Sequence, residues 1–90
     1  MPVYFKYSGW YVFFWSNENN EPIHFHIAEG NPKKNSTKIW ILKNGSFRME
    51  HNKSQVPPKV LHHILIIMQT SIEEYKSLWL QYQKEIQYIE

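Results

Sequence analysis

The heptapeptide that separates polar from apolar side chains most sharply is Glu21-Pro22-Ile23-His24-Phe25-His26-Ile27. Side chains of an extended strand alternate between two faces, so the two histidines are expected on one face, about 6.6 Å apart along the strand. The three apolar side chains fall on the other face. Two imidazoles at this spacing can reach one phosphate, one metal ion or one substrate, so the sequence predicts a functional site at His24 and His26 above an apolar core.

Strand-forming residues continue on both sides of this heptapeptide. Residues 3–7 and 10–15 are rich in Val, Tyr, Phe and Trp, and the short turn Ser8-Gly9 between them predicts a hairpin. A polar loop over 16–22 leads into the histidine strand, expected at about 23–28. Two further strands, 37–42 and 47–51, flank Asn44-Gly45, the strongest two-residue hairpin signal.

A two-residue loop at Asn44-Gly45 sets the register of this second hairpin. It pairs Leu42 with Phe47, Trp40 with Met49, Ile41 with Arg48 and Lys38 with His51. The core-facing residues are then Trp40, Leu42, Phe47 and Met49, with Lys43, Arg48 and Glu50 on the opposite side and the direction of His51 left open.

Beyond Pro57-Pro58 the apolar period changes from two to about 3.5, which is typical of a helix. The sequence predicts an α+β fold: an antiparallel sheet of four to five strands over 3–51, packed on one long C-terminal helix, continuous or kinked, over 57–89. The alternative is two helices with a break near Thr70-Ser71, where a capping-box pattern occurs.

One domain, 1–90, is expected. An unbroken helix overhangs the sheet and offers an interface to a partner or a second copy through these residues: Tyr75, Trp79, Tyr82 and Ile86.

Composition excludes several kinds of site. The chain has no cysteine and no aspartate, so disulfides, thiolate zinc sites, cysteine nucleophiles and Asp-based triads are ruled out. The first residues carry no signal-peptide pattern and no apolar run reaches membrane-spanning length, so we expect a cytoplasmic protein without membrane contact.

The net charge of +2 is unevenly distributed. Residues 33–53 hold six cations against one acid, Glu50, and this segment is either a solvated lysine face or a patch for RNA or an acidic protein partner. A single arginine argues against sequence-specific DNA recognition. The patch residues are Lys33, Lys34, Lys38, Lys43, Arg48 and Lys53.

The histidine pair itself has three interpretations. Both rings can be structural, with every nitrogen hydrogen-bonded inside the fold. They can act as acid and base, because imidazole titrates near neutrality. We expect no cofactor; the alternative is that the two rings bind a divalent transition metal, which needs further ligands. The candidates for those ligands are Glu18, Glu21, Glu29 and His51.

The order of these features resembles the small bacterial family called domain of unknown function 4160, over about residues 3–83. The residues that carry the resemblance are Phe13-Phe14-Trp15-Ser16-Asn17-Glu18, the Pro-x-His-Phe-His-Ile strand at 22–27, Ile39-Trp40-Ile41-Leu42, the Asn-Gly hairpin and Leu78-Trp79. Ile23 stands where the family pattern has a second proline. The resemblance maps His24 and His26 onto the family's signature histidines, and it implies gene arrangements similar to toxin-antitoxin pairs, beside the domain of unknown function 2442 family.

These observations lead to three functional hypotheses. The first is a toxin-antitoxin-like or mobile-element protein that acts through a small, co-encoded protein partner. The second is a small ribonuclease-like toxin with His24 and His26 as acid and base and RNA as substrate. The third is a metal-binding protein built on the same pair. The sequence leaves open whether the protein is an enzyme.

Overall fold

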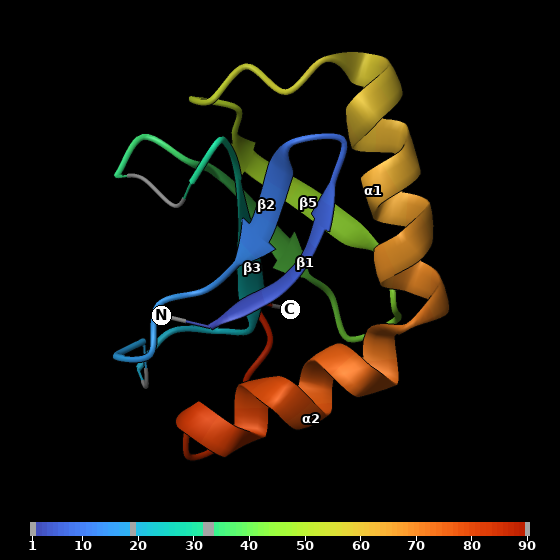
Figure 1. Ribbon diagram of the computed structural model, residues 1–90. Helices are drawn as coiled ribbons and strands as arrows, with labels where there is room; N and C mark the ends of the chain where they lie inside the picture. Colours follow the sequence, from blue (N-terminus) through green and yellow to red (C-terminus); the bar gives the residue numbers. More distant parts are fainter. Residues whose placement is uncertain (1, 19, 32–33, 90) are drawn as a thin grey trace.

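In the computed structural model, a five-stranded antiparallel sheet packs against two helices in an α+β arrangement (Figure 1). The structure describes residues 2–18, 20–31 and 34–89. The strands lie in the sheet in sequence order, each antiparallel to its neighbours. The elements are β1 (Val3–Tyr7), β2 (Trp10–Phe13), β3 (His24–Glu29), β4 (Thr37–Ile41), β5 (Phe47–His51), α1 (Pro58–Thr70) and α2 (Ile72–Tyr82).

The first hairpin forms as the sequence predicts. Ser8 and Gly9 have φ values of +50° and +83°, and Tyr7 pairs with Trp10 across the turn. Two consecutive left-handed residues make a turn of type I′, whose twist matches that of the strands it joins. The short polar turn therefore fixes the register of residues 5–7 against β2, and a bulge shifts the pairing between Val3 and Phe5.

The predicted register of the second hairpin is wrong by one residue. Ile41 pairs with Phe47 and Trp40 with Arg48, because the Leu42 N–H donates to the Ser46 carbonyl and leaves a three-residue loop in place of two. Gly45, with φ of +91°, occupies the third loop position, the left-handed site of a three-residue hairpin loop. Because a slip of one residue exchanges the faces, Trp40 points away from the core.

A β-bulge then restores one predicted pair. Between Lys38 and Ile39 the register shifts, so Lys38 does pair with His51. Met49, expected inside, pairs with Ile39 and keeps 40% of its surface exposed. The bulge turns His51 onto the same face as Lys38, because paired residues share a face of the sheet.

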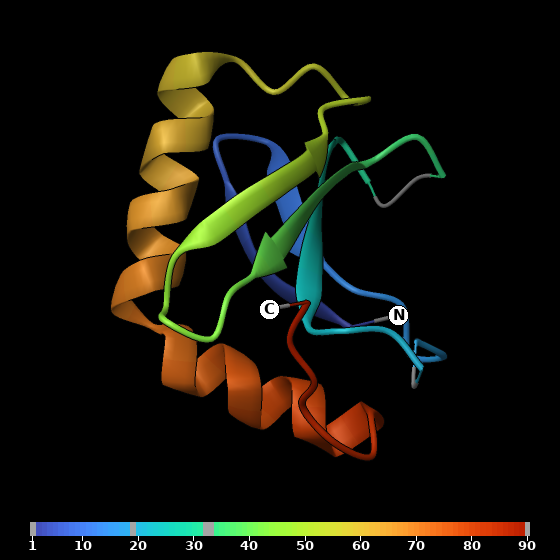
Figure 2. The same ribbon diagram turned by 180° about the vertical axis from the view of Figure 1, so that it is seen from behind.

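The single long helix expected over 57–89 is two helices. The chain bends at Ser71, which ends α1 and begins α2, and α2 runs at an angle to α1 (Figures 1 and 2). The Thr70 and Ser71 hydroxyls donate to the carbonyls four residues earlier, and this type of bond often bends helices. No side chain of the expected capping box caps α2, although Glu73 and Glu74 in its first turn suit the helix dipole. Residues 83–89 are not helical.

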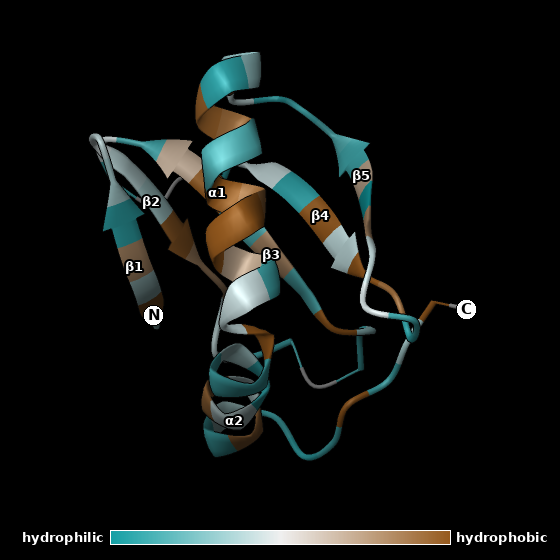
Figure 3. Cartoon of the chain, turned by 90° about the vertical axis from the view of Figure 1, so that its right-hand side faces the viewer, coloured by the Kyte–Doolittle hydropathy of each residue, from teal (hydrophilic) through white to brown (hydrophobic). Residues whose placement is uncertain are grey.

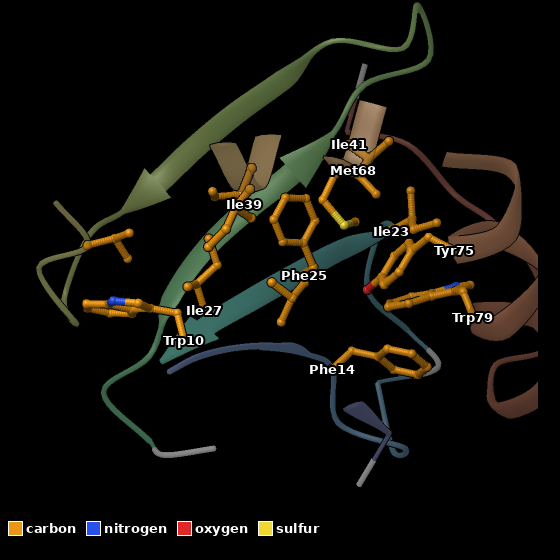
Figure 4. Close-up of a cluster of buried hydrophobic side chains, with 13 residues drawn as sticks. Trp10, Phe14, Ile23, Phe25, Ile27, Ile39, Ile41, Met68, Tyr75 and Trp79 are labelled. Carbon is orange, nitrogen blue, oxygen red and sulfur yellow. The ribbon is translucent and has the colours of Figure 1, made fainter. Parts of the chain in front are cut away.

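The core lies between the sheet and the helices. One face of the sheet, called here the helix face, is lined by apolar side chains; α1 lies across this face and α2 lies at the end of the sheet, as Figure 3 shows. Figure 4 shows the cluster, with Tyr75 and Trp79 of α2 beside Ile23. The buried members are Trp10, Val12, Phe14, Ile23, Phe25, Ile27, Ile39, Ile41, Val56, Ile64, Met68, Tyr75 and Trp79.

The opposite face of the sheet, called here the outer face, is polar and aromatic. Cross-strand pairing places two rows on it: Phe13, His26 and Lys38, and His24, Trp40 and Arg48. In the part of the chain that the structure describes, neither helix has the length and apolar content that crossing a bilayer requires.

Candidate metal centre

Glu18 reaches the histidines on the outer face because its loop folds back over the sheet. Between β2 and β3, a backbone bond from the Glu21 N–H to the Glu18 carbonyl closes a turn. The Trp15 N–H donates to Oε1 of Glu18 at 2.7 Å, which fixes the direction of the carboxylate. The side chain is 8% exposed and lies over the outer face.

The alternation of β3 brings His24 and His26 together as predicted. Their ring centroids are 4.8 Å apart. Oε2 of Glu18 is 2.7 Å from Nε2 of His24 and 3.4 Å from Nε2 of His26. One donor atom from each of the three residues lies within 4.8 Å of the other two, and no other such group occurs among residues 2–18, 20–31 and 34–89.

The bond from His24 to Pro22 determines what this cluster can hold. Nδ1 of His24 is 2.8 Å from the Pro22 carbonyl oxygen, which can only accept, so Nδ1 carries a proton. In a neutral ring, Nε2 then presents a lone pair to the Glu18 carboxylate at 2.7 Å. Two acceptors at this distance need a proton between them, and a metal ion can take the place of that proton only if the two atoms move apart.

Aromatic rings and the C-terminal part of the chain enclose the cluster. His24 has no exposed surface, and its ring lies 5.4 Å from both Trp40 and Trp79. The buried Tyr75 hydroxyl donates to the His24 carbonyl, and burial raises the Tyr75 pKa well above its usual value. His26 is 8% exposed, and its ring lies 5.4 Å from Phe13. Solvent therefore approaches from the side of Glu18 and His26.

Hydrogen bonds keep the Glu18 carboxylate ionised. Burial disfavours the carboxylate and by itself raises its pKa, but hydrogen bonds from His24 and His26, the positive charge of His24 and the Trp15 N–H outweigh burial. The net effect lowers the Glu18 pKa far below its ordinary value of 4.5. The lowered pKa keeps the carboxylate ionised at neutral pH.

This lowered pKa predicts acid sensitivity of the metal-free protein. The unfolded state takes up a proton on Glu18 near pH 4.5 while the folded state does not, so stability from this group is complete above that pH and falls as the pH decreases below it. Urea unfolding between about pH 6 and pH 3 should show this loss in the wild type. Glu18→Gln should show a shallower slope, and Glu29→Gln, an exposed control, should retain the wild-type slope. Equal slopes for the wild type and Glu18→Gln would contradict the prediction.

The four residues predicted as additional metal ligands lie in different places. Glu18 joins the pair, whereas Glu21 binds Lys38 at 2.6 Å and Glu29 is exposed at the end of β3. His51 shares the outer face with His26 across Lys38 and lies outside the three-residue cluster. Nδ1 of His26 and Nδ1 of His51 are buried without a hydrogen-bond partner among the described residues. Burial lowers the His51 pKa.

The predicted basic patch is spread along β4, β5 and the loops around them. Lys38 is half-buried, bound to Glu21 and stacked on Trp40, with its Nζ 4.3 Å from the ring centroid. Arg48 is exposed on the outer face of β5. Lys34 lies in the loop before β4, Lys53 in the loop after β5 and Lys43 in the hairpin loop between β4 and β5. Lys33 lies outside the described residues.

The residues predicted to form a partner interface do not share one surface. Tyr75 and Trp79 have no exposed area and belong to the core. Tyr82 is 46% exposed, and Ile86, which is not helical, packs partly buried against the core. The bend at Ser71 brings α2 back to the sheet, so the expected overhang is absent.

The chain matches one known protein family over most of its length. The family described as Domain of unknown function (DUF4160) matches residues 9–80 of the 90-residue chain. The chain belongs to this family. The DUF4160 match contains Glu18, His24 and His26 and extends from the first hairpin to α2. No curated protein and no solved structure matches the chain.

Proposed function

We propose that the protein binds one divalent transition-metal ion through Glu18, His24 and His26. Two imidazole nitrogens and one carboxylate oxygen are a donor set that Zn²⁺ accepts readily. The observation that carries the proposal is the His24 Nε2 atom, directed at the Glu18 carboxylate while Nδ1 is bound to the Pro22 carbonyl. A metal ion supplies the positive charge that this pair of acceptors needs.

The distances are compatible with a metal ion after a small movement. With metal-ligand bonds near 2.0–2.1 Å, two donors of a tetrahedral site lie roughly 3.3 Å apart. The separation of 3.4 Å between Oε2 and Nε2 of His26 fits, and the 2.7 Å contact to His24 must open by about 0.6 Å. Rotation of the Glu18 side chain supplies this movement. The bond from His24 to Pro22 matches the second hydrogen bond that orients metal-binding histidines.

Three protein donors leave one tetrahedral position for water or another ligand. Sites with three ligands and an open position are typical of reactive zinc, whereas structural zinc has four protein ligands. The remaining exposure of Glu18 and His26 puts the open position on their side of the cluster, away from His24. The proposed ion would therefore exchange its fourth ligand with solvent.

Metal titration tests this proposal directly. Protein purified without an affinity tag and stripped with chelator should bind Zn²⁺ or Co²⁺ at one ion per chain in calorimetry. His26→Ala should weaken binding by roughly 100-fold or more, exceeding the loss expected for an outer hydrogen-bond partner. His51→Ala, which removes an imidazole from the same face, should bind as the wild type does. Absence of binding by the wild type would show that a proton alone occupies the cluster, and equal binding by His26→Ala would show that the metal binds without the proposed three ligands.

The other two hypotheses from the sequence stay predictions. An acid/base role needs substrate at the imidazoles, and of the two rings His26 keeps some exposure while His24 has none. A partner-binding role, as in the toxin-antitoxin hypothesis, now depends on Tyr82 among the four predicted interface residues, since it is the exposed one. RNA binding by the lysines and residence in the cytoplasm are likewise untested expectations.

A further inference from the structure

We infer that Gln83 is a positioning residue for Glu18, and that it couples docking of the C-terminal segment, residues 83–89, to occupancy of the metal centre. The inference rests on the proposed metal function. It assigns a role to a residue 65 positions away from Glu18 in sequence. The DUF4160 match ends at residue 80, before this segment begins.

Gln83 is linked to the carboxylate through one residue, Trp15. Gln83 is 3% exposed, and its Nε2 donates to the Trp15 carbonyl at 3.0 Å. The Trp15 N–H in turn donates to Oε1 of Glu18 at 2.7 Å. Gln83 thus holds the backbone of Trp15 in the orientation that presents its N–H to the carboxylate. Oxygen Oε2 is left to face the two histidines.

The same segment also holds the other side of the centre. The Ile23 N–H donates to the Gln87 carbonyl at 2.8 Å, and the Trp79 indole N–H donates to the Glu85 carbonyl at 3.2 Å. Ile23 lies between Pro22 and His24, the two residues whose bond sets the direction of Nε2. Figure 2 shows the segment passing from the end of α2 to the start of β3. Both chain stretches that carry ligands are therefore bound to residues 83–89.

Gln83 also carries a buried amide oxygen with no hydrogen-bond partner in the described part of the chain. Leaving a buried acceptor unpaired is unfavourable, and an apolar side chain would avoid it. The Nε2 of the Gln83 side chain, in contrast, has a partner, because it donates to the Trp15 carbonyl. By linkage, if the docked segment favours metal binding, the metal must favour docking by the same factor.

The experiment compares Gln83→Met and Gln83→Glu with Gln87→Met. The two Gln83 variants remove the N–H donor. Gln87→Met alters an exposed side chain that donates to Glu85, and it leaves the backbone carbonyl in place. The Gln83 variants should bind Zn²⁺ about tenfold more weakly, as expected for an outer hydrogen-bond partner. They should also shift the absorption bands of bound Co²⁺, a change that a loss of stability alone does not produce. In the wild type, Zn²⁺ should slow hydrogen exchange of the Ile23 amide.

The outcomes separate this inference from the proposed function. If the wild type binds Zn²⁺ and the Gln83 variants bind it equally well with the same Co²⁺ spectrum, the coupling is wrong and the metal centre stands. If the wild type binds no metal, the proposed function and the coupling are both wrong. The metal-free arm then tests positioning alone: the Trp15 amide should exchange faster and change its chemical shift in the Gln83 variants, and an unchanged amide would overturn that role too.

Discussion

Glu18→Ala is expected to lower the free energy of unfolding of the metal-free protein by about 3 kcal/mol. The change removes the acceptor for His24, His26 and the Trp15 N–H in a region where His24 has no contact with solvent. Breaking a buried ion pair by removing one partner typically costs about 3–5 kcal/mol. The 8% exposure of Glu18 places the expected loss at the lower end.

Urea unfolding at neutral pH in the presence of chelator measures this loss. Glu29→Ala removes an exposed glutamate from the end of β3 and should change the free energy of unfolding by less than about 0.5 kcal/mol. A double-mutant cycle with His24→Ala isolates the pair, and the combined variant should lose less than the two single losses together. Strict additivity would mean that Glu18 and His24 do not interact in solution.

The sequence predicts the parts of this site that depend on neighbouring residues, but not the parts that depend on contacts between distant residues. Alternation within β3 is local, so the shared face of His24 and His26 and the burial of Phe25 follow from sequence alone. The choice of Glu18 among four possible ligands does not, because it depends on how the chain turns at Glu18 and Glu21 and on one backbone bond from Trp15. Gln83 carries no sequence signal, since its partner lies 68 residues away.

The hairpin between β4 and β5 shows how a strong local signal can give the wrong face. Asn44-Gly45 fits a two-residue loop and also a three-residue loop with glycine in the left-handed position. Ile39 and Ile41 can fill the core only with the second choice, and both are at most 1% exposed. Burial of the two isoleucines decides between loops that the turn residues alone do not distinguish.

In the helical region, tertiary contacts override a regular local pattern. The apolar repeat is regular through Ser71, so the pattern favours one helix, yet a straight helix would carry Trp79 away from the sheet. The Tyr4 hydroxyl donates to the Ser71 carbonyl, so β1 satisfies a group at the bend. The bend returns α2 to the sheet, where Tyr75 and Trp79 complete the core. Burial of a second apolar surface thus outweighs the continuity of the helix.

Trp79→Ala is expected to have the largest effect of any substitution proposed here, a loss of about 3–5 kcal/mol in the free energy of unfolding. Trp79 is fully buried, and its ring packs against Phe14 with centroids 5.1 Å apart and against His24 at 5.4 Å. Removing the indole leaves a cavity beside the cluster of Glu18, His24 and His26. A domain of this size has a total stability of about 5–15 kcal/mol, so part of the variant should be unfolded at 37 °C.

Chemical unfolding and circular dichroism measure this loss, with Trp79→Phe as a milder variant that keeps a ring in place. Leu80→Ala, on the same helix but 49% exposed, should remain within about 0.5 kcal/mol of the wild type. Tyr82→Ala supplies the matching test of the partner hypothesis, because Tyr82 is 46% exposed and contacts the core through an edge-on packing of its ring against Phe14. Wild-type stability of Trp79→Ala would require Trp79 to lie on the surface, where the predicted interface had placed it. Because the indole instead closes one wall around His24, we expect its removal to weaken the fold and the Glu18–His24 contact together.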